Sequence, residues 1–409
     1  MKTSHTLLAL ACLAPGLASA SGFALNEQSV KSMGTALAGR ASSAEDATTL
    51  YGNPAGMSRL SGINLSGNAT YIFVPADIEN TSGFPNTGTN DGDMIPPQWV
   101  GSSFATLQVN DVLTAGIGMY APFGLATNYE DSFQGRYFGD KSKVKTFAIQ
   151  PTASLRLNDR FSLGAGLVIS KIEGTLSKYI TPLAPGSHVL IRGDDMSHSF
   201  NLGALAEISD STRVGVTFHS RTRYQLAGTT HVSNLAAIGG SADYPASLDI
   251  ATPASWDLSI THKASPTLTV HGLLSQTGWG VLDELVIKNA GAPGALAVAK
   301  EELHWGTTWL YSLGAEWRYS DAITLRSGIG HDETPIDGAY RSVRVPSADR
   351  DYISFGLGWR WDERTSFDLS YSFLKEDTAH INRTENGLTY TADFKGSGHL
   401  FGMQANLKF

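Results

Sequence analysis

Residues 161–170 read FSLGAGLVIS, and every second residue of this stretch is apolar. One side of an extended chain would carry Phe161, Leu163, Ala165, Leu167 and Ile169. The residues between them are mostly serine and glycine. Successive side chains of a β-strand point to opposite faces, so the stretch predicts a strand with one strongly apolar face.

The same alternation recurs in residues 309–319, 353–361 and 400–409. In each stretch the charged residues lie on the face with the smaller side chains, and in the first two stretches tryptophan or tyrosine gathers near the strand ends. A soluble β-sandwich also alternates, but its buried face rarely carries aromatic residues at the ends of its strands. An apolar outer band with aromatic girdles and a polar interior is typical of a transmembrane β-barrel.

The spacing of polar segments predicts the number of strands. Six short turns carry Asn, Asp, Ser or Pro, at residues 109–112, 157–160, 208–212, 263–266, 319–322 and 361–364. Seven longer stretches alternate with them, near residues 75–98, 121–143, 177–197, 230–250, 289–305, 332–350 and 376–396. Thirteen connections join fourteen antiparallel strands, and both termini would then lie at the short-turn, periplasmic end.

The fold expected is therefore all-β, a closed fourteen-stranded antiparallel transmembrane barrel over residues 61–409. Closure follows because every unpaired backbone group in hydrocarbon costs several kcal/mol. A lumen of this size is too wide to be filled by the wall's own side chains. Residues 21–60 do not alternate and are rich in Ala, Gly and Ser, so we expect them to form a partly helical hatch inside the barrel.

The first residues predict an export signal. Lys2 precedes an apolar stretch, and Ala18-Ser19-Ala20 is typical of a cleavage site, so residues 1–20 are expected to be removed. A lipoprotein anchored at Cys12 is the alternative, although Ala9 stands where a bulky aliphatic residue is expected. Cys12 is the sole cysteine, so the exported chain would lack disulfides and cysteine-based sites.

Charge and composition exclude some partners. The formal net charge is −8, and no basic stripe is present to neutralise phosphates, so nucleic acid is not an expected partner. His331-Asp332-Glu333 opens a polar stretch without a further ligand at metal-binding spacing, and Asp194-Asp195 is interpreted in the same way. Neither a metal nor a cofactor is expected.

Several motifs resemble the FadL family of outer-membrane long-chain fatty acid transporters. The resemblance begins in the segment expected to form the hatch, at residues 21–29, Glu45-Asp46-Ala47 and Asn53-Pro54-Ala55-Gly56-Met57. It continues through residues 121–127, Thr277-Gly278-Trp279 and residues 335–350, and so spans nearly the whole exported chain. The family's fold, a fourteen-stranded barrel closed by an N-terminal hatch, agrees with the strand count.

The resemblance implies passive transport in the outer membrane. An apolar ligand, with a long-chain fatty acid expected first, would be caught by extracellular loops, enter an internal pocket and leave sideways through the wall. The residues that match the family's ligand and gating positions are Phe23, Leu25, Asn53, Pro54, Ala55, Pro122, Phe123 and Gly124. The last three match an inward kink of the third strand, where proline and glycine would interrupt pairing, although the family usually has another residue at Pro122.

Other assignments rest on less specific features. The cations considered for a ligand carboxylate are Lys171, Lys178, Arg192 and Lys300. The apolar loop residues expected to capture ligand are Phe133, Tyr137, Phe138, Leu235 and Leu296. The C-terminal Phe409 is expected to be recognised by the barrel-assembly machinery, the surroundings to be outer-membrane lipid, and the protein to be a monomer.

Three alternatives remain open. Monoaromatic hydrocarbons or other apolar compounds could be the ligand, and a general porin is a second possibility, although a porin has no comparable N-terminal hatch. An outer-membrane hydrolase is the third. His219-Ser220 raises that reading, but no Gly-x-Ser-x-Gly or His-Glu-x-x-His motif occurs, and alternation would place these two neighbours on opposite faces. We therefore expect no enzyme.

Overall fold

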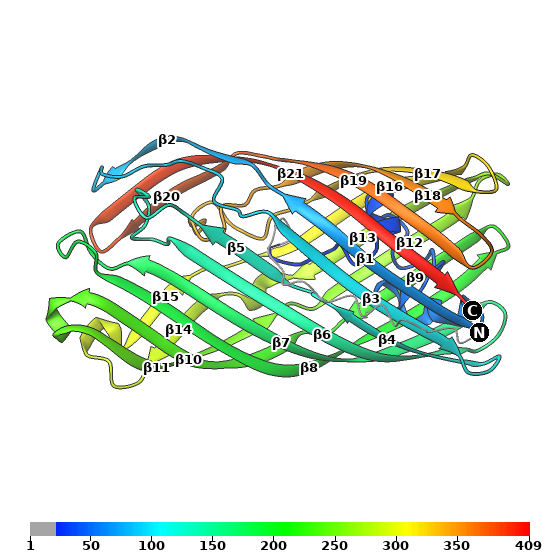
Figure 1. Cartoon of the computed structure of the whole chain (residues 1–409), viewed down its shortest axis with the longest axis horizontal. Coiled ribbons are helices and arrows are strands. Elements are labelled where there is room, and N and C mark those ends of the chain that lie inside the picture. Colours follow the sequence, from blue (N-terminus) through cyan, green and yellow to red (C-terminus); the bar gives the residue numbers. More distant parts are fainter. Residues whose placement is uncertain (1–21) are drawn as a thin grey trace, which may run out of the picture.

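A computed structural model describes residues 22–409, and the strands from Ile63 onward form one continuous antiparallel sheet that closes on itself (Figure 1). The last long strand, β21, pairs with the first, β1, from Asn64↔Lys408 to Phe73↔His399. Every wall strand therefore has two neighbours, as a membrane barrel requires. The expected all-β barrel is confirmed, whereas the predicted leader, residues 1–20, lies outside the described residues.

The wall contains fourteen strands, as the turn count predicts. Eleven are single elements: β1 (Ile63–Phe73), β3 (Gln98–Gln108), β6 (Lys141–Arg156), β7 (Phe161–Tyr179), β8 (His188–Ser209), β13 (Leu268–Gly278), β16 (Thr307–Arg318), β17 (Ile323–Asp332), β18 (Arg350–Arg360), β19 (Thr365–Glu376) and β21 (Leu388–Lys408). Three are interrupted and have two parts each: β4 (Leu113–Tyr120) with β5 (Gly124–Asn128), β9 (Thr212–His219) with β10 (Thr222–Leu235), and β11 (Gly240–Thr252) with β12 (Ser255–Lys263).

The longer connections differ from the prediction because much of their length is strand. Four further strands extend the wall at the end opposite the short turns: β2 (Ala76–Phe84), β14 (Glu284–Asn289), β15 (Val298–Glu302) and β20 (Ala379–Glu385). Strand β10 and strand β11 likewise fill most of residues 230–250, which were expected to be a loop. Beyond the apolar band both faces of a strand are polar, so the alternation that reveals strands is lost there. Short 3-10 turns complete these connections: η2 (Ala236–Ile238), η3 (Trp279–Val281) and η4 (Gly294–Leu296).

The two faces of the wall carry the predicted chemistry. On β18, Phe355 is 50% exposed on the outer face, whereas its neighbour Ser354 is fully buried toward the lumen. Aromatic pairs mark the short-turn rim, with Trp317 against Tyr319 and Trp359 against Trp361. No helix in residues 22–409 is long and apolar enough to cross a membrane.

The polypeptide from Gly22 to Leu60 lies inside the barrel (Figure 1). It contains α1 (Val30–Gly34), α2 (Thr49–Gly52) and the 3-10 helix η1 (Pro54–Arg59), with α1 against β18 and β19 and η1 against β6, β7 and β8. Ser29 caps α1 by accepting a hydrogen bond from the backbone N–H of Ser32. Small residues in this segment allow its backbone to pack closely against the wall. We call residues 22–60 the lumen segment.

The start of the first wall strand and the C-terminal residue meet at the short-turn rim. The backbone N–H groups of Ile63 and Phe409 each donate to the other residue's carbonyl oxygen. Phe409 is 62% exposed, and its recognition during assembly stays a prediction, as does the monomeric state. The short turns of bacterial barrels face the periplasm, which orients the long strand extensions toward the outside of the cell.

Candidate functional site

The third wall strand is broken at Ala121-Pro122-Phe123, between β4 and β5. On its β6 side the pairing moves from Tyr120↔Ala148 to Gly124↔Lys145, so the broken strand has one residue more than its partner. On its β3 side the ladder ends at Ser103↔Met119, and residues 98–102 of β3 pair only with β1. The pairing of the third strand is therefore interrupted at the residues expected to form a kink, and we call this interruption the first slot.

The start of the lumen segment covers this slot from inside. Ala24 pairs antiparallel with Phe123, the backbone N–H of Leu25 donates to the carbonyl of Pro122 at 2.9 Å, and that of Gly124 donates to the carbonyl of Phe23 at 2.8 Å. The side chain of Gln28 adds a bond to the carbonyl of Ala121 at 2.7 Å. Residues 23–28 thus use the backbone groups that β3 leaves unpaired.

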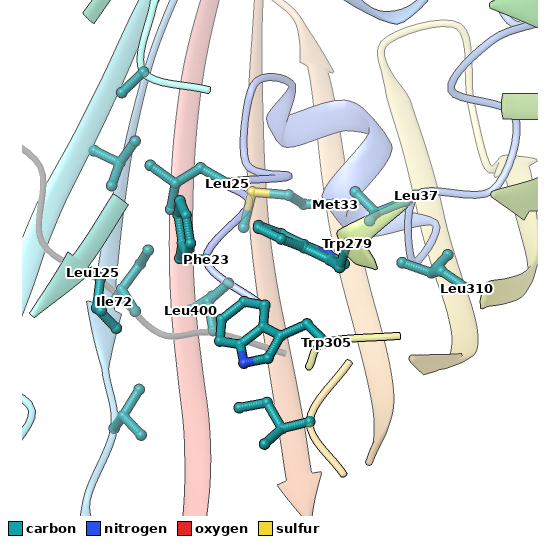
Figure 2. Packing of buried hydrophobic residues seen from close by; sticks show 14 of the residues in the cluster. Phe23, Leu25, Met33, Leu37, Ile72, Leu125, Trp279, Trp305, Leu310 and Leu400 are labelled. Atoms are coloured by element: carbon teal, nitrogen blue, oxygen red, sulfur yellow. The ribbon is translucent and has the colours of Figure 1, made fainter. Parts of the chain in front are cut away.

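Phe23 lies at the centre of an apolar cluster on the extracellular side of this contact (Figure 2). Its ring centroid is 4.8 Å from that of Trp279, 5.8 Å from that of Phe123 and 6.0 Å from that of Trp305. Phe23 is 4% exposed and Leu25 is 1% exposed, both in this cluster. Apolar burial of this extent is worth about 1.5–3 kcal/mol for each side chain. The expectation that Phe23 lies in an apolar internal site is consistent with this arrangement.

Residues 23–26 lie between this cluster and an internal cavity of about 70 Å³. Phe23 and Leu25 are buried in the cluster, Asn26 lines the cavity, and Ala24 borders both. Pro122 and Phe123 line the same cavity, so it reaches the first slot, and Phe123 also packs against the cluster.

The Asn53-Pro54-Ala55 motif holds the opposite part of the lumen segment against the wall. The Asn53 amide donates to the carbonyls of Ala41 at 2.7 Å and Ala204 at 2.9 Å, and its oxygen accepts from the backbone N–H of Ala55 at 3.0 Å. Wall glycines permit this approach, because a Cβ on Gly203 would overlap the Asn53 oxygen and a Cβ on Gly164 would overlap the Pro54 backbone. The three motif residues are buried and lie far from the first slot.

Buried charges hold the middle of the segment. Arg40 donates to both carboxylate oxygens of Asp257 on β12, at 3.0 and 2.8 Å, and also to the side-chain oxygen of Asn26 at 2.7 Å. The Arg40 and Asp257 side chains are 8% and 3% exposed. Arg40 therefore connects the wall to the residues that cover the first slot.

The four cations predicted from sequence do not converge on the cluster or the cavity. Lys171 faces outward beside Glu173 and Asp194, and Lys300 belongs to the exposed β14–β15 hairpin, paired with Glu284. Lys178 lies 3.9 Å from Glu385. Arg192 is exposed on β8.

Arg350 ends the stretch 335–350 that carries the family resemblance, and it is a buried cation that was not among the four predicted to bind a carboxylate. Its side chain is 6% exposed, and its nearest ion-pair oxygen, on Glu376, is 3.8 Å away. Within residues 22–409, neither its Nε nor one terminal nitrogen has a hydrogen-bond partner. Tyr352, two residues further along the same face of β18, packs against the apolar cluster. Arg350 therefore offers free N–H donors beside an apolar site.

The five apolar residues expected to capture ligand differ in their exposure. Phe133, Tyr137 and Phe138 are 8% exposed or less, because they form the core of a cap made by the extracellular connections, so they do not offer a capture surface. Leu235 and Leu296 are partly exposed. Trp279 and Trp305, which contact Phe23, were not identified as ligand-site residues, although Trp279 belongs to a motif that carries the family resemblance.

His219 and Ser220 both line the cavity, contrary to the expectation from alternation. The strand is interrupted directly after His219, so the alternation does not continue to Ser220. The His219 ring packs on Tyr51 at 5.0 Å, the Ser220 hydroxyl accepts from the backbone N–H of Phe200, and Asp257 is engaged by Arg40. These partners do not form a nucleophile–base relay. Residues 22–409 contain no group of three side chains suited to hold a metal.

Known proteins resemble this chain along its length. A protein family described as outer membrane protein transport protein (OMPP1/FadL/TodX) matches residues 11–409. The chain is 26% identical over 446 residues to a long-chain fatty acid transport protein of Escherichia coli O6:H1, covering 100% of this chain and 99% of that protein.

Solved structures share the fold. A crystal structure of a Pseudomonas aeruginosa FadL homologue superposes with a TM-score of 0.86 at 22% identity, covering 95% of this chain and 100% of that one. The Ralstonia pickettii toluene transporter TbuX superposes with a TM-score of 0.65 at 17% identity, covering 89% and 94% of the two chains. The chain therefore shares its overall fold with these solved structures.

Proposed function

Because this chain belongs to the outer membrane protein transport family that includes FadL and TodX, we propose that it carries long-chain fatty acids across the outer membrane by passive diffusion. The protein is an outer-membrane barrel, and its family consists of transport proteins for hydrophobic compounds. The 26% identical relative from Escherichia coli, which transports long-chain fatty acids, supports that ligand class.

The observation that carries the proposed route is the contact of residues 23–26 with the first slot. An apolar chain enters from the extracellular side into the cluster around Phe23 and replaces its side chain and that of Leu25. Residues 23–26 then leave the broken strand, to which they are bound by two backbone hydrogen bonds, one to Pro122 and one to Gly124. The ligand reaches the cavity and leaves through the unpaired edge of β3 into the membrane. The lumen segment below serves as the hatch and blocks polar solutes.

Arg350 is proposed to bind the ligand's carboxylate. A hydrogen bond to a charged group contributes about 1.5–3 kcal/mol, or roughly 10- to 100-fold in affinity. We therefore expect Arg350→Gln to lower oleate uptake at limiting oleate by about that factor and to leave toluene uptake unchanged. Lys300→Gln, on the exposed hairpin, is the matched control, and its uptake of oleate and of toluene is expected to equal that of the unmodified protein. Equal loss of oleate and toluene in Arg350→Gln would show that Arg350 acts on folding and not on the carboxylate.

Monoaromatic hydrocarbons are the second candidate ligand, because the apolar cluster contains the rings of Phe23, Phe123, Trp279 and Trp305. The toluene transporter TbuX has the same fold, which is consistent with this candidate. The occupied interior disfavours a general porin.

Uptake of radiolabelled oleate and toluene separates the candidates. Cells that lack their own transporter are complemented with the intact protein or with a variant that lacks residues 22–25. The proposal predicts oleate uptake with the intact protein and reduced uptake with the variant. Toluene uptake alone would assign the protein to hydrocarbons. Uptake of neither compound by a correctly inserted barrel would contradict the transport function for both ligands.

A further inference from the structure

A second interruption of the wall lies between β8 and the strand formed by β9 and β10. The β8–β9 ladder ends at Asn201↔His219, and the β8–β10 ladder begins again at Ala227↔Asp194. Between these points the register shifts by one residue, and residues 195–200 have no continuous ladder with residues 220–226. Residues 195–200 remain paired to β7, and residues 222–226 remain paired to β11. Ser220 and Arg221 belong to neither ladder, because the pairing of β9 with β12 ends at His219↔Ser255 and that of β10 with β11 begins at Thr222↔Thr252. The interruption is therefore a slot bordered by β7 on one side and by β11 on the other.

Few bonds close this second slot. Ser220 exchanges two bonds with the backbone of Phe200, both 2.9 Å, and the backbone N–H of Gln225 donates to the Asp195 carboxylate at 2.7 Å. Between these contacts lie residues 196–199 and 221–224. The first slot is covered by the lumen segment, whereas the second is closed by single polar contacts of its own edges. Such contacts are weaker than a continuous ladder because they include side chains that can rotate.

The internal cavity reaches both slots. Ser199, Phe200, Ser220 and Thr222 line it at the second slot, and Pro122 and Phe123 line it at the first. Phe200 is also 47% exposed on the outer face of the barrel, so the same residue borders both the cavity and the outer surface. The β6–β7 and β7–β8 registers align Tyr120 with Ser170 and His198 with Ile169, so the two slots lie within one residue of each other along the hydrogen-bond rows of the wall.

The outer rim of the second slot combines apolar and cationic groups. Phe218 lies between Phe200 and Trp256 below the slot, with ring centroids at 6.0 and 4.4 Å. Arg221 and Arg223 are exposed beside it, and within residues 22–409 neither has an ion-pair partner. An amphiphile with an anionic head would keep its head at these arginines while its chain enters the apolar band.

We infer that the slot between β8 and β9–β10 is a second lateral opening, through which an amphiphile with an anionic head and an apolar chain passes between the internal cavity and the outer leaflet. This inference rests on the proposed transport function. Ser220 and Phe200 close the opening in the ligand-free protein. The chain then has two exits from one cavity, and only the first is covered by residues 23–28.

Closing each slot separately tests the inference through uptake of radiolabelled oleate. Deletion of Pro122 removes the extra residue of the third strand and restores its register with β6, which closes the first slot. Cysteines in place of Ser199 and Thr222, joined by a reducible bifunctional thiol reagent, close the second. The sole native cysteine, Cys12, lies in the predicted leader. Cysteines at Ala206 and Val214, which face each other in the intact β8–β9 ladder, provide the control.

The expected result is that the Pro122 deletion alone retains part of the oleate uptake. Cross-linking Ser199→Cys and Thr222→Cys in that background abolishes the remainder, and reduction restores it, whereas the control cross-link changes nothing. The inference is overturned if the Pro122 deletion alone abolishes uptake, or if the cross-link leaves the remaining uptake unchanged. Recovery on reduction, together with heat-modifiable electrophoretic mobility, distinguishes closure from misfolding.

A cross-linked Gly101→Cys and Ala121→Cys pair replaces the deletion if that variant does not fold. Absence of oleate uptake by the unmodified protein would refute the proposed function itself, and is thus distinguishable from failure of the second opening.

Discussion

Alanine in place of Gly203 is expected to force the Asn53-Pro54-Ala55 motif away from the wall and to open a polar path through the barrel. The added Cβ would overlap the Asn53 side-chain oxygen and lie 2.7 Å from Cδ of Pro54. Neither group can move freely, because Asn53 is bound to two carbonyls and proline is rigid. Overpacking of this kind costs about 1–3 kcal/mol.

The measurement for Gly203→Ala is conductance in planar bilayers, together with the sensitivity of cells to a large polar antibiotic such as vancomycin. Both should rise. Gly174→Ala is the control, because its Cβ would meet Leu226 at an ordinary 3.4 Å. Conductance and antibiotic sensitivity equal to those of the unmodified protein would show that residues 53–55 do not hold the hatch closed.

Removal of the Asp257 carboxylate is expected to destabilise the lumen segment strongly. Asp257→Ala leaves the Arg40 guanidinium buried without its carboxylate, and an uncompensated charge of this kind costs about 3–5 kcal/mol. Because Arg40 also binds Asn26, the loss should loosen the residues that cover the first slot. The temperature at which the barrel loses its heat-modifiable mobility is expected to fall.

Two further variants separate charge burial from general damage. The double variant Arg40→Met and Asp257→Leu removes both charges and should recover most of the stability, since replacing a buried ion pair by apolar residues is often neutral. Glu79→Ala breaks the Lys395–Glu79 pair, which is about half exposed at both ends, and should change stability by less than about 1 kcal/mol. Equal effects of Asp257→Ala and Glu79→Ala would contradict the role assigned to Arg40.

The wall was predictable because its chemistry repeats at every second residue. Phe355 faces lipid and its neighbour Ser354 faces the lumen, as strict alternation predicts. The short turns between such strands indicate the number of strands. The strand extensions were missed because neither face is apolar outside the membrane. The break after His219 was missed for a different reason, because neither Ser220 nor Arg221 is a glycine or a proline. The proline next to this break, Pro253, lies in the neighbouring strand, between β11 and β12.

The candidate site was predictable only in part. Phe23 and Pro122 followed from the family resemblance, but the contact of Phe23 with Trp279 and Trp305 joins residues far apart in the chain, which no local pattern reveals. Lys171 could have been excluded as a carboxylate ligand from sequence alone. It follows Leu167 and Ile169 at every second position of one strand, so its side chain points to the same, outer face. Arg350 could not have been selected, because its free donors result from the packing around it.

A disulfide between residues 24 and 123 tests the central claim most directly, namely that ligand passes only when residues 23–26 leave the wall. Ala24 and Phe123 form a non-hydrogen-bonded antiparallel pair, flanked by the two backbone bonds. In such a pair the Cα atoms are about 4.5 Å apart, within the range that a disulfide spans.

The Ala24→Cys, Phe123→Cys variant should therefore lose oleate uptake when oxidised and regain it on reduction, whereas each single cysteine variant should respond to neither treatment. Residues 23–26 lie between the apolar cluster and the cavity that reaches both slots, so the lock should stop passage through either one. Undiminished uptake by the fully oxidised variant would contradict the account.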